Sequence, residues 1–181
     1  MIEKNCSLKA FNSFSIDANT HHLFHFQELS QLPELLTLIK QTKVEHQPIL
    51  VLGGGSNTLF CDDFSGLVIK VELTGIHKTE DDKCNFLQVA AGENWHDLVC
   101  NTIDQGINGL ENLALIPGVV GAAPVQNIGA YGVELKDFCV SVDYIDLENG
   151  ELKTLTNEAC LFAYRDSIFK GQLKDKALIT S

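Results

Sequence analysis

The chain has 181 residues, of which 45% are hydrophobic and 20% are charged. This composition supports a folded core and excludes an intrinsically disordered chain. The net charge of −11 argues against nucleic acid or an anionic membrane surface as the main partner, because both are bound through basic patches. No run approaches the roughly 18 apolar residues of a membrane helix, so no membrane partner is expected.

The first half of the chain predicts a βαβ-like arrangement. We expect a helix over residues 30–41, where apolar side chains recur at helical spacing, and buried strands over 49–52 and 67–71. The polar run 79–83 predicts a turn or a seam between subdomains. Three histidines (His21, His22 and His25) are expected to decorate an edge rather than hold a metal, because neighbouring residues of a strand point to opposite faces.

The second half predicts one helix and several strands. The helix is expected to begin after Asn94, its N-cap, and to end at Gly106. Asn149-Gly150 is a hairpin signal. Strands are expected over 86–90, 140–144, 152–155 and 176–181. The whole pattern predicts an α+β protein with two small sheets rather than a doubly wound one, and the last strand has no cap or polar tail after it, as if the chain were cut inside a fold.

Cysteine usage and the N-terminus indicate a compartment. The six cysteines form no CxxC motif and no zinc-finger spacing with histidine, so no metal site is expected. The first residues contain no apolar signal region. We therefore expect a cytoplasmic protein with reduced, mostly buried thiols.

A glycine-rich loop follows the first predicted buried strand directly. It reads Gly53-Gly54-Gly55-Ser56-Asn57. Successive glycines let the backbone turn sharply and point several N–H groups at one place, and such a nest binds phosphate without a cationic side chain. The loop lacks the lysine of a Walker A motif and the third glycine of a Rossmann fingerprint. It predicts a phosphate site, and the alternative is a plain turn between strands.

Residues 112–133 contain no charged side chain. Pro117-Gly118 marks a turn within this stretch, and glycines recur there in pairs three residues apart. A chargeless backbone rich in glycine and alanine suits a large, flat, apolar ligand such as a flavin ring, to which Asn112, Gln126 and Asn127 could donate neutral hydrogen bonds. The alternative is a tightly packed loop without a ligand.

Arg165 is the only arginine of the chain, and it stands between Tyr164 and Asp166. Arginine offers a rigid fork that grips a carboxylate or phosphate with two parallel hydrogen bonds. The residues alone allow two interpretations, a substrate-binding fork or a structural ion pair with Asp166.

Four segments together resemble one protein family: residues 53–57, 92–96, 109–135 and 164–170. The most specific motifs are Ala114-Leu115-Ile116-Pro117-Gly118 and Gln126-Asn127-Ile128-Gly129-Ala130-Tyr131-Gly132. They are similar to those of the UDP-N-acetylenolpyruvoylglucosamine reductases, the flavin-dependent reductases of peptidoglycan precursor synthesis. The resemblance runs from about Leu8 to the end of the chain and covers roughly the N-terminal half of the family's length.

The resemblance implies the FAD-binding fold shared with vanillyl-alcohol oxidase (the PCMH type), built from two small α/β subdomains, which we expect over residues 1–78 and 79–181. The fold would be truncated before the C-terminal substrate domain. The resemblance also implies non-covalent FAD, held at its diphosphate by the glycine-rich loop and at its ring by the following loops. The residues implied to bind FAD are Gly53, Gly55, Ser56, Asn57, Pro117, Gly118, Ala122, Gln126, Asn127, Ile128 and Gly129.

In this family NADPH reduces the flavin, and hydride then passes to the enolpyruvyl ether of UDP-N-acetylglucosamine. The matching substrate residues are Tyr131, Tyr164 and Arg165, and the resemblance implies a catalytic role for Arg165. A bidentate arginine suits the negative charge that grows on the substrate carboxylate during hydride addition. A monomer is expected.

The departure from the family lies in what the chain lacks. The family's serine proton donor and its activating glutamate match no residue here, so we expect this chain alone to be inactive as a reductase. Two other interpretations stay open, a non-catalytic FAD- or nucleotide-binding fragment and another FAD-dependent oxidoreductase on the same fold.

Overall fold

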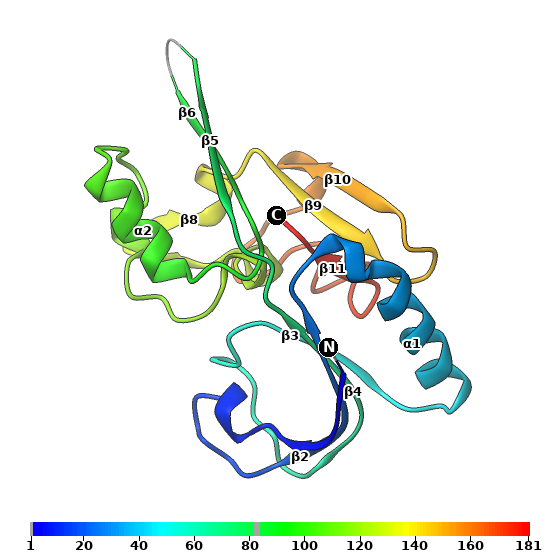
Figure 1. Ribbon diagram of the computed structural model, residues 1–181. Helices are drawn as coiled ribbons and strands as arrows, with labels where there is room; N and C mark the ends of the chain where they lie inside the picture. Colours follow the sequence, from blue (N-terminus) through cyan, green and yellow to red (C-terminus); the bar gives the residue numbers. More distant parts are fainter. Residues whose placement is uncertain (1, 82–83) are drawn as a thin grey trace.

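The computed structural model describes residues 2–81 and 84–181 (Figure 1). Its N-terminal half is built on a four-stranded sheet with the order β1-β2-β4-β3. The strands are β1 (Ile2–Ser7), β2 (Asn19–Phe26), β3 (Ile49–Leu52) and β4 (Phe64–Val71). β1 is antiparallel to β2, whereas β2 and β3 both run parallel to β4. The helix between β2 and β3 completes a βαβ unit whose two strands flank β4, so the predicted arrangement is confirmed.

The start of helix α1 (Leu32–Val44) is favoured by the residues of its first turn, and its packing by an apolar stripe. Pro33 occupies the first turn, where its missing N–H costs no hydrogen bond, and Glu34 stands near the positive end of the helix dipole. The buried face is formed by Leu35, Leu38, Ile39 and Thr42. The helix begins two residues later than predicted, because residues 29–31 form a separate 3-10 turn.

The C-terminal half holds a second sheet, two hairpins and a helix. The sheet has the order β10-β9-β11, with β9 antiparallel to both neighbours. The elements are β5 (Ile76–Glu80), β6 (Asn85–Val89), α2 (Trp95–Asp104), β7 (Gly129–Ala130), β8 (Val133–Glu134), β9 (Ser141–Asp146), β10 (Leu152–Thr156) and β11 (Ala177–Ile179). Asn94 caps α2 as predicted, since its side chain accepts a hydrogen bond from the N–H of Asp97 at 3.1 Å. The β5–β6 hairpin projects from the body of the molecule (Figure 1).

Seven short 3-10 helices complete the chain. They are η1 (Lys9–Phe11), η2 (Leu29–Gln31), η3 (Glu111–Leu113), η4 (Val120–Ala122), η5 (Pro124–Gln126), η6 (Leu135–Asp137) and η7 (Glu158–Cys160) within the residues that the structure describes. η4 and η5 lie within the chargeless stretch 112–133 and η3 overlaps its start, while the short strands β7 and β8 stand at its end.

Several sequence predictions need correction. The turn predicted over 79–83 is wrong for residues 79 and 80, which belong to β5, while residues 82 and 83 lie outside the described residues. The histidines do not decorate an edge, because β2 is flanked by β1 and β4. All six cysteines are free, but Cys61, Cys84 and Cys100 are exposed and Cys160 alone is fully buried, so the expected burial of most thiols is wrong.

The largest hydrophobic cluster joins the two halves. It contains Phe24 and Leu67 from the first sheet, Leu35 from α1, and Tyr144 and Leu178 from the second sheet. The predicted boundary at residues 78 and 79 falls inside β5, and the division into two subdomains stays a prediction. None of the helices in the described part of the chain is long and apolar enough to cross a membrane.

Candidate functional site: two backbone loops and an arginine cavity

The glycine-rich loop lies at the carboxyl ends of β3 and β4, the edge of a parallel sheet where ligands bind in α/β folds. Within residues 2–81 and 84–181, the backbone N–H groups of Gly54, Gly55, Ser56 and Asn57 find no acceptor in the protein. Gly54 and Asn57 are exposed and Ser56 is partly exposed. Consecutive donors without an acceptor form the kind of nest that binds anions, and the phosphate site stays a prediction.

Because its three glycines have no Cβ atom, neighbouring segments of the protein approach this loop closely. A Cβ at Gly53 would lie 2.6 Å from Val119 Cγ2, and one at Gly54 would lie 3.2 Å from the Cα of Gly118. Gly55 has a φ of +66°, and a Cβ there would lie 1.9 Å from the carbonyl oxygen of Phe11. The glycines thus allow the loop to pack closely on two neighbouring segments, 117–119 and 11–12.

The loop 117–122 is the second wall of the site. It approaches the glycine-rich loop so closely that a Cβ at Gly118 would lie 3.2 Å from Ser56 Oγ. Backbone bonds fix it to the segment just before α2: Trp95 N–H donates to Gly118 at 3.1 Å, and Gly121 N–H donates to Ala91 at 2.8 Å. Pro117 and Ala122 are exposed beside this contact. Two predicted binding segments that lie far apart in sequence are therefore brought together.

The next segment, residues 126–129, is held by its own side chains. Asn127 is 1% exposed and has a left-handed backbone with φ of +43°. Its Nδ2 donates to the carbonyl of Ala163 at 3.0 Å, and its Oδ1 accepts from the N–H of Lys136 at 3.0 Å. Ile128 packs in the core beside Trp95 and Leu113. Asn127 and Ile128 thus support the loop with their side chains, and their backbone N–H groups also donate within the protein, to Pro124 and Ala123.

Arg165 lies at a separate cavity of about 470 Å³, together with Tyr131 and Tyr164. The tyrosines are 88% and 83% exposed. Arg165 Nη2 donates to the carbonyl of Gly129 at 3.1 Å, which ties the cavity to the end of the chargeless stretch. The structure thus brings together the three predicted substrate residues.

The ion-pair interpretation of Arg165 is wrong. Asp166 Oδ1 instead accepts a hydrogen bond from the N–H of Ser167 at 3.0 Å. Among the described residues Arg165 forms no ion pair, so most of its guanidinium donors remain available to a ligand.

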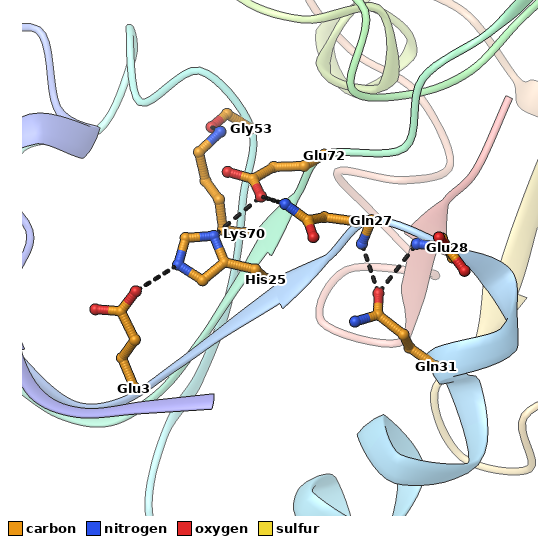
Figure 2. Close-up of polar contacts among 8 residues, drawn as sticks. All are labelled: Glu3, His25, Gln27, Glu28, Gln31, Gly53, Lys70 and Glu72. Carbon is orange, nitrogen blue, oxygen red and sulfur yellow. Dashed lines mark hydrogen bonds and ion pairs between the residues drawn. The ribbon is translucent and has the colours of Figure 1, made fainter. Parts of the chain in front are cut away.

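Lys70 is a site residue that was not predicted from the sequence. Its ammonium group donates to the carbonyl of Gly53 at 2.8 Å, which places a cation against the glycine-rich loop (Figure 2). Burial lowers the pKa of Lys70, and the carboxylate of Glu72 partly opposes this shift. The signal in the sequence was a single charge in the otherwise apolar strand 67–71, one residue before its carboxyl end.

Comparison with known proteins shows the family to which this chain belongs. The chain belongs to the FAD binding domain family, which it matches over residues 27–156. Cholesterol oxidase shares this fold, with a TM-score of 0.58 over 95% of this chain and 36% of that chain at 12% identity. The predicted FAD-binding fold is therefore confirmed.

The relatives narrow the class further. The chain is 53% identical to the UDP-N-acetylenolpyruvoylglucosamine reductase of Shewanella sp. (strain MR-7) over 175 residues, which are 97% of this chain and 50% of the relative. It is 50% identical to the enzyme of that name from Photorhabdus laumondii. The crystal structure of this reductase from Thermus caldophilus has a TM-score of 0.73 at 26% identity and covers 99% of this chain and 60% of that chain. The predicted resemblance is confirmed, and the chain spans about half the length of its curated relatives.

Proposed function

We propose that this chain binds FAD non-covalently and forms the FAD-binding half of an NADPH-dependent reductase. Its substrate would be the enolpyruvyl ether of UDP-N-acetylglucosamine, and its product UDP-N-acetylmuramate. The observation that carries the proposal is the row of four unpaired N–H groups from Gly54 to Asn57, packed against a chargeless second loop. The names of the relatives support the same function.

The residues present fit FAD. The N–H groups of the glycine-rich loop and the hydroxyl of the partly exposed Ser56 would bind its diphosphate. The exposed backbone of Pro117 to Ala122 would line the ring, where the absence of charge suits a flat and largely apolar surface. When bound, FAD supplies the hydride chemistry that no amino-acid side chain can supply.

The arginine cavity would hold the substrate carboxylate. Arg165 can bind it with two parallel N–H donors, a geometry that lysine cannot reproduce. Negative charge grows on this carboxylate as hydride is added, so the interaction strengthens in the transition state. The exposed rings of Tyr131 and Tyr164 would flank the substrate, and Asn127 holds the backbone of Ala163 in place beside them.

The proposal carries further expectations. The proton donor of the family matches no residue of this chain, so we expect at most trace turnover from these residues alone, because a general acid typically contributes about 10²–10⁴-fold. We also propose a cytoplasmic monomer with no nucleic-acid or membrane partner.

Flavin fluorescence titration tests the cofactor site. The chain should bind FAD and release all of it on acid precipitation. Ser56→Ala should weaken binding by roughly tenfold or more, because a hydrogen bond to a charged group contributes about 1.5–3 kcal/mol. Ser65→Ala, at another exposed serine, should bind FAD like the unaltered chain. Failure of the unaltered chain to bind FAD, or an unchanged affinity of Ser56→Ala, would contradict the assignment.

A further inference from the structure

A partly buried lysine, Lys70, contacts the glycine-rich loop that we propose binds the diphosphate. Lys70 lies one residue before the end of β4 and pairs in register with Leu52, the last residue of β3. From there its ammonium group reaches past the strand end and donates to the Gly53 carbonyl at 2.8 Å (Figure 2). Lys70 is the one cation, among the residues that the structure describes, with a hydrogen bond to residues 53–57.

Glu72 lies near this lysine and is itself held by polar contacts. Glu72 directly follows the end of β4, where its N–H donates to the carbonyl of Phe26 at 2.9 Å, and its charge acts on Lys70. Glu72 Oε2 accepts from Gln27 at 3.1 Å and contacts His25 Nδ1 at 2.9 Å. His25 in turn contacts Glu3 at 3.2 Å (Figure 2). The carboxylate of Glu72 is therefore held in place and partly offsets the lysine charge.

We propose that Lys70 is a positioning residue of the FAD site: it holds the Gly53 carbonyl inward, so that the following N–H groups face the diphosphate, and it supplies the local positive charge. Glu72 sets the strength of that charge. This inference rests on the proposed function. A local cation favours an anionic cofactor here, because the chain carries a net charge of −11, which repels it.

Stability does not account for this lysine. Its ammonium group is half-buried and donates to a neutral carbonyl, and burial lowers its pKa, so the folded protein disfavours the charge. Replacing a desolvated charge with an apolar side chain of similar length is often neutral or stabilising. A lysine that served only the fold would gain little from this position.

Fluorescence titration of FAD with a double-mutant cycle tests the inference. Lys70→Met should weaken FAD binding by roughly tenfold or more, since a partly buried charge in contact with the loop acts through an effective dielectric below that of water. Glu72→Gln should tighten binding by roughly twofold or more, because it releases the lysine charge. In the double variant the effect of Glu72→Gln should vanish. Lys40→Met, which removes an exposed lysine of α1, controls for net charge and should change binding by less than about twofold.

Each outcome decides the inference. Equal FAD affinity of Lys70→Met and the unaltered chain would overturn it while leaving the proposed function intact. Weaker binding by both single variants, with a lower urea midpoint of the apo chain, would also overturn it, because that result indicates a structural role. Failure of the unaltered chain to bind FAD would remove both proposals. Opposite signs of the two single variants, with an unchanged apo urea midpoint for Lys70→Met, would support it.

Discussion

Gly55 offers a direct test of how the glycine-rich loop is held. Its backbone has a φ of +66°, and an added Cβ would meet the Phe11 carbonyl oxygen at 1.9 Å and the Cα of Asn12 at 3.1 Å. Asn12 is buried and its side chain makes three hydrogen bonds to the backbone of Leu8 and Ile16. We therefore expect Gly55→Ala to destabilise the fold itself, in addition to any effect on a cofactor.

The expected cost has two parts. The left-handed conformation costs a residue with a Cβ about 1–2 kcal/mol. The Phe11 carbonyl must also move by more than about 1 Å to relieve the contact, which would disturb at least two of the Asn12 hydrogen bonds, each worth about 0.5–1.5 kcal/mol. The sum is about 2–5 kcal/mol, a large share of the roughly 5–15 kcal/mol that stabilises a typical domain.

Urea unfolding of the apo chain, followed by tryptophan fluorescence and circular dichroism, measures this cost. Gly106→Ala is the matched control, because Gly106 has a φ of +70° and nothing lies within 4 Å of an added Cβ. It should cost only the backbone part, about 1–2 kcal/mol. Equal destabilisation by the two substitutions would refute the reasoning, because it would mean that the contact with Phe11 has no energetic weight.

Three further predictions concern the arginine cavity, its support and the second sheet. In a full-length protein containing this chain, Arg165→Lys should slow substrate-dependent flavin reoxidation by about 10²–10³-fold and leave reduction by NADPH nearly unchanged, as rapid-mixing absorbance would show; equal slowing of both steps would indicate a structural role. Asn127→Ala should cost about 1–3 kcal/mol in urea unfolding, because the buried Asn127 side chain loses two hydrogen bonds of about 0.5–1.5 kcal/mol each, whereas Asn112→Ala at an exposed site should cost almost nothing. The hydrogen bond from Lys153 lowers the pKa of the Asp146 carboxyl. The stability that the ionised Asp146 contributes is therefore present above the unfolded carboxyl pKa of about 3.9 and is lost as the pH falls through the lower folded pKa. The urea midpoints of the unaltered chain and Asp146→Asn should thus converge below about pH 4, and a constant difference would contradict this assignment.

Local sequence patterns determined most of the elements and the family. The strand 49–52, the Asn94 cap and the Asn149-Gly150 hairpin are each encoded within a few residues, and each is found in the structure. The glycine-rich loop and the chargeless stretch were also recognisable, because they depend on residue types that few other structures require. β2 was missed, since its three histidines hide the alternation of a strand that is buried between two neighbours.

The tertiary structure decided how these parts act together. Only the fold brings Gly118 against Ser56, Asn127 under Ala163, and Lys70 beneath Gly53, because each pair lies at least 17 residues apart in the chain. The fold also shows what the glycines of the loop are for: their missing Cβ atoms make room for Val119, Gly118 and Phe11. No short-range pattern encodes such contacts, since they depend on the packing of strands and loops that are distant in sequence. The residue types at the site are thus readable from the sequence, whereas the direction of its donors and the charge beneath them come from the packed chain.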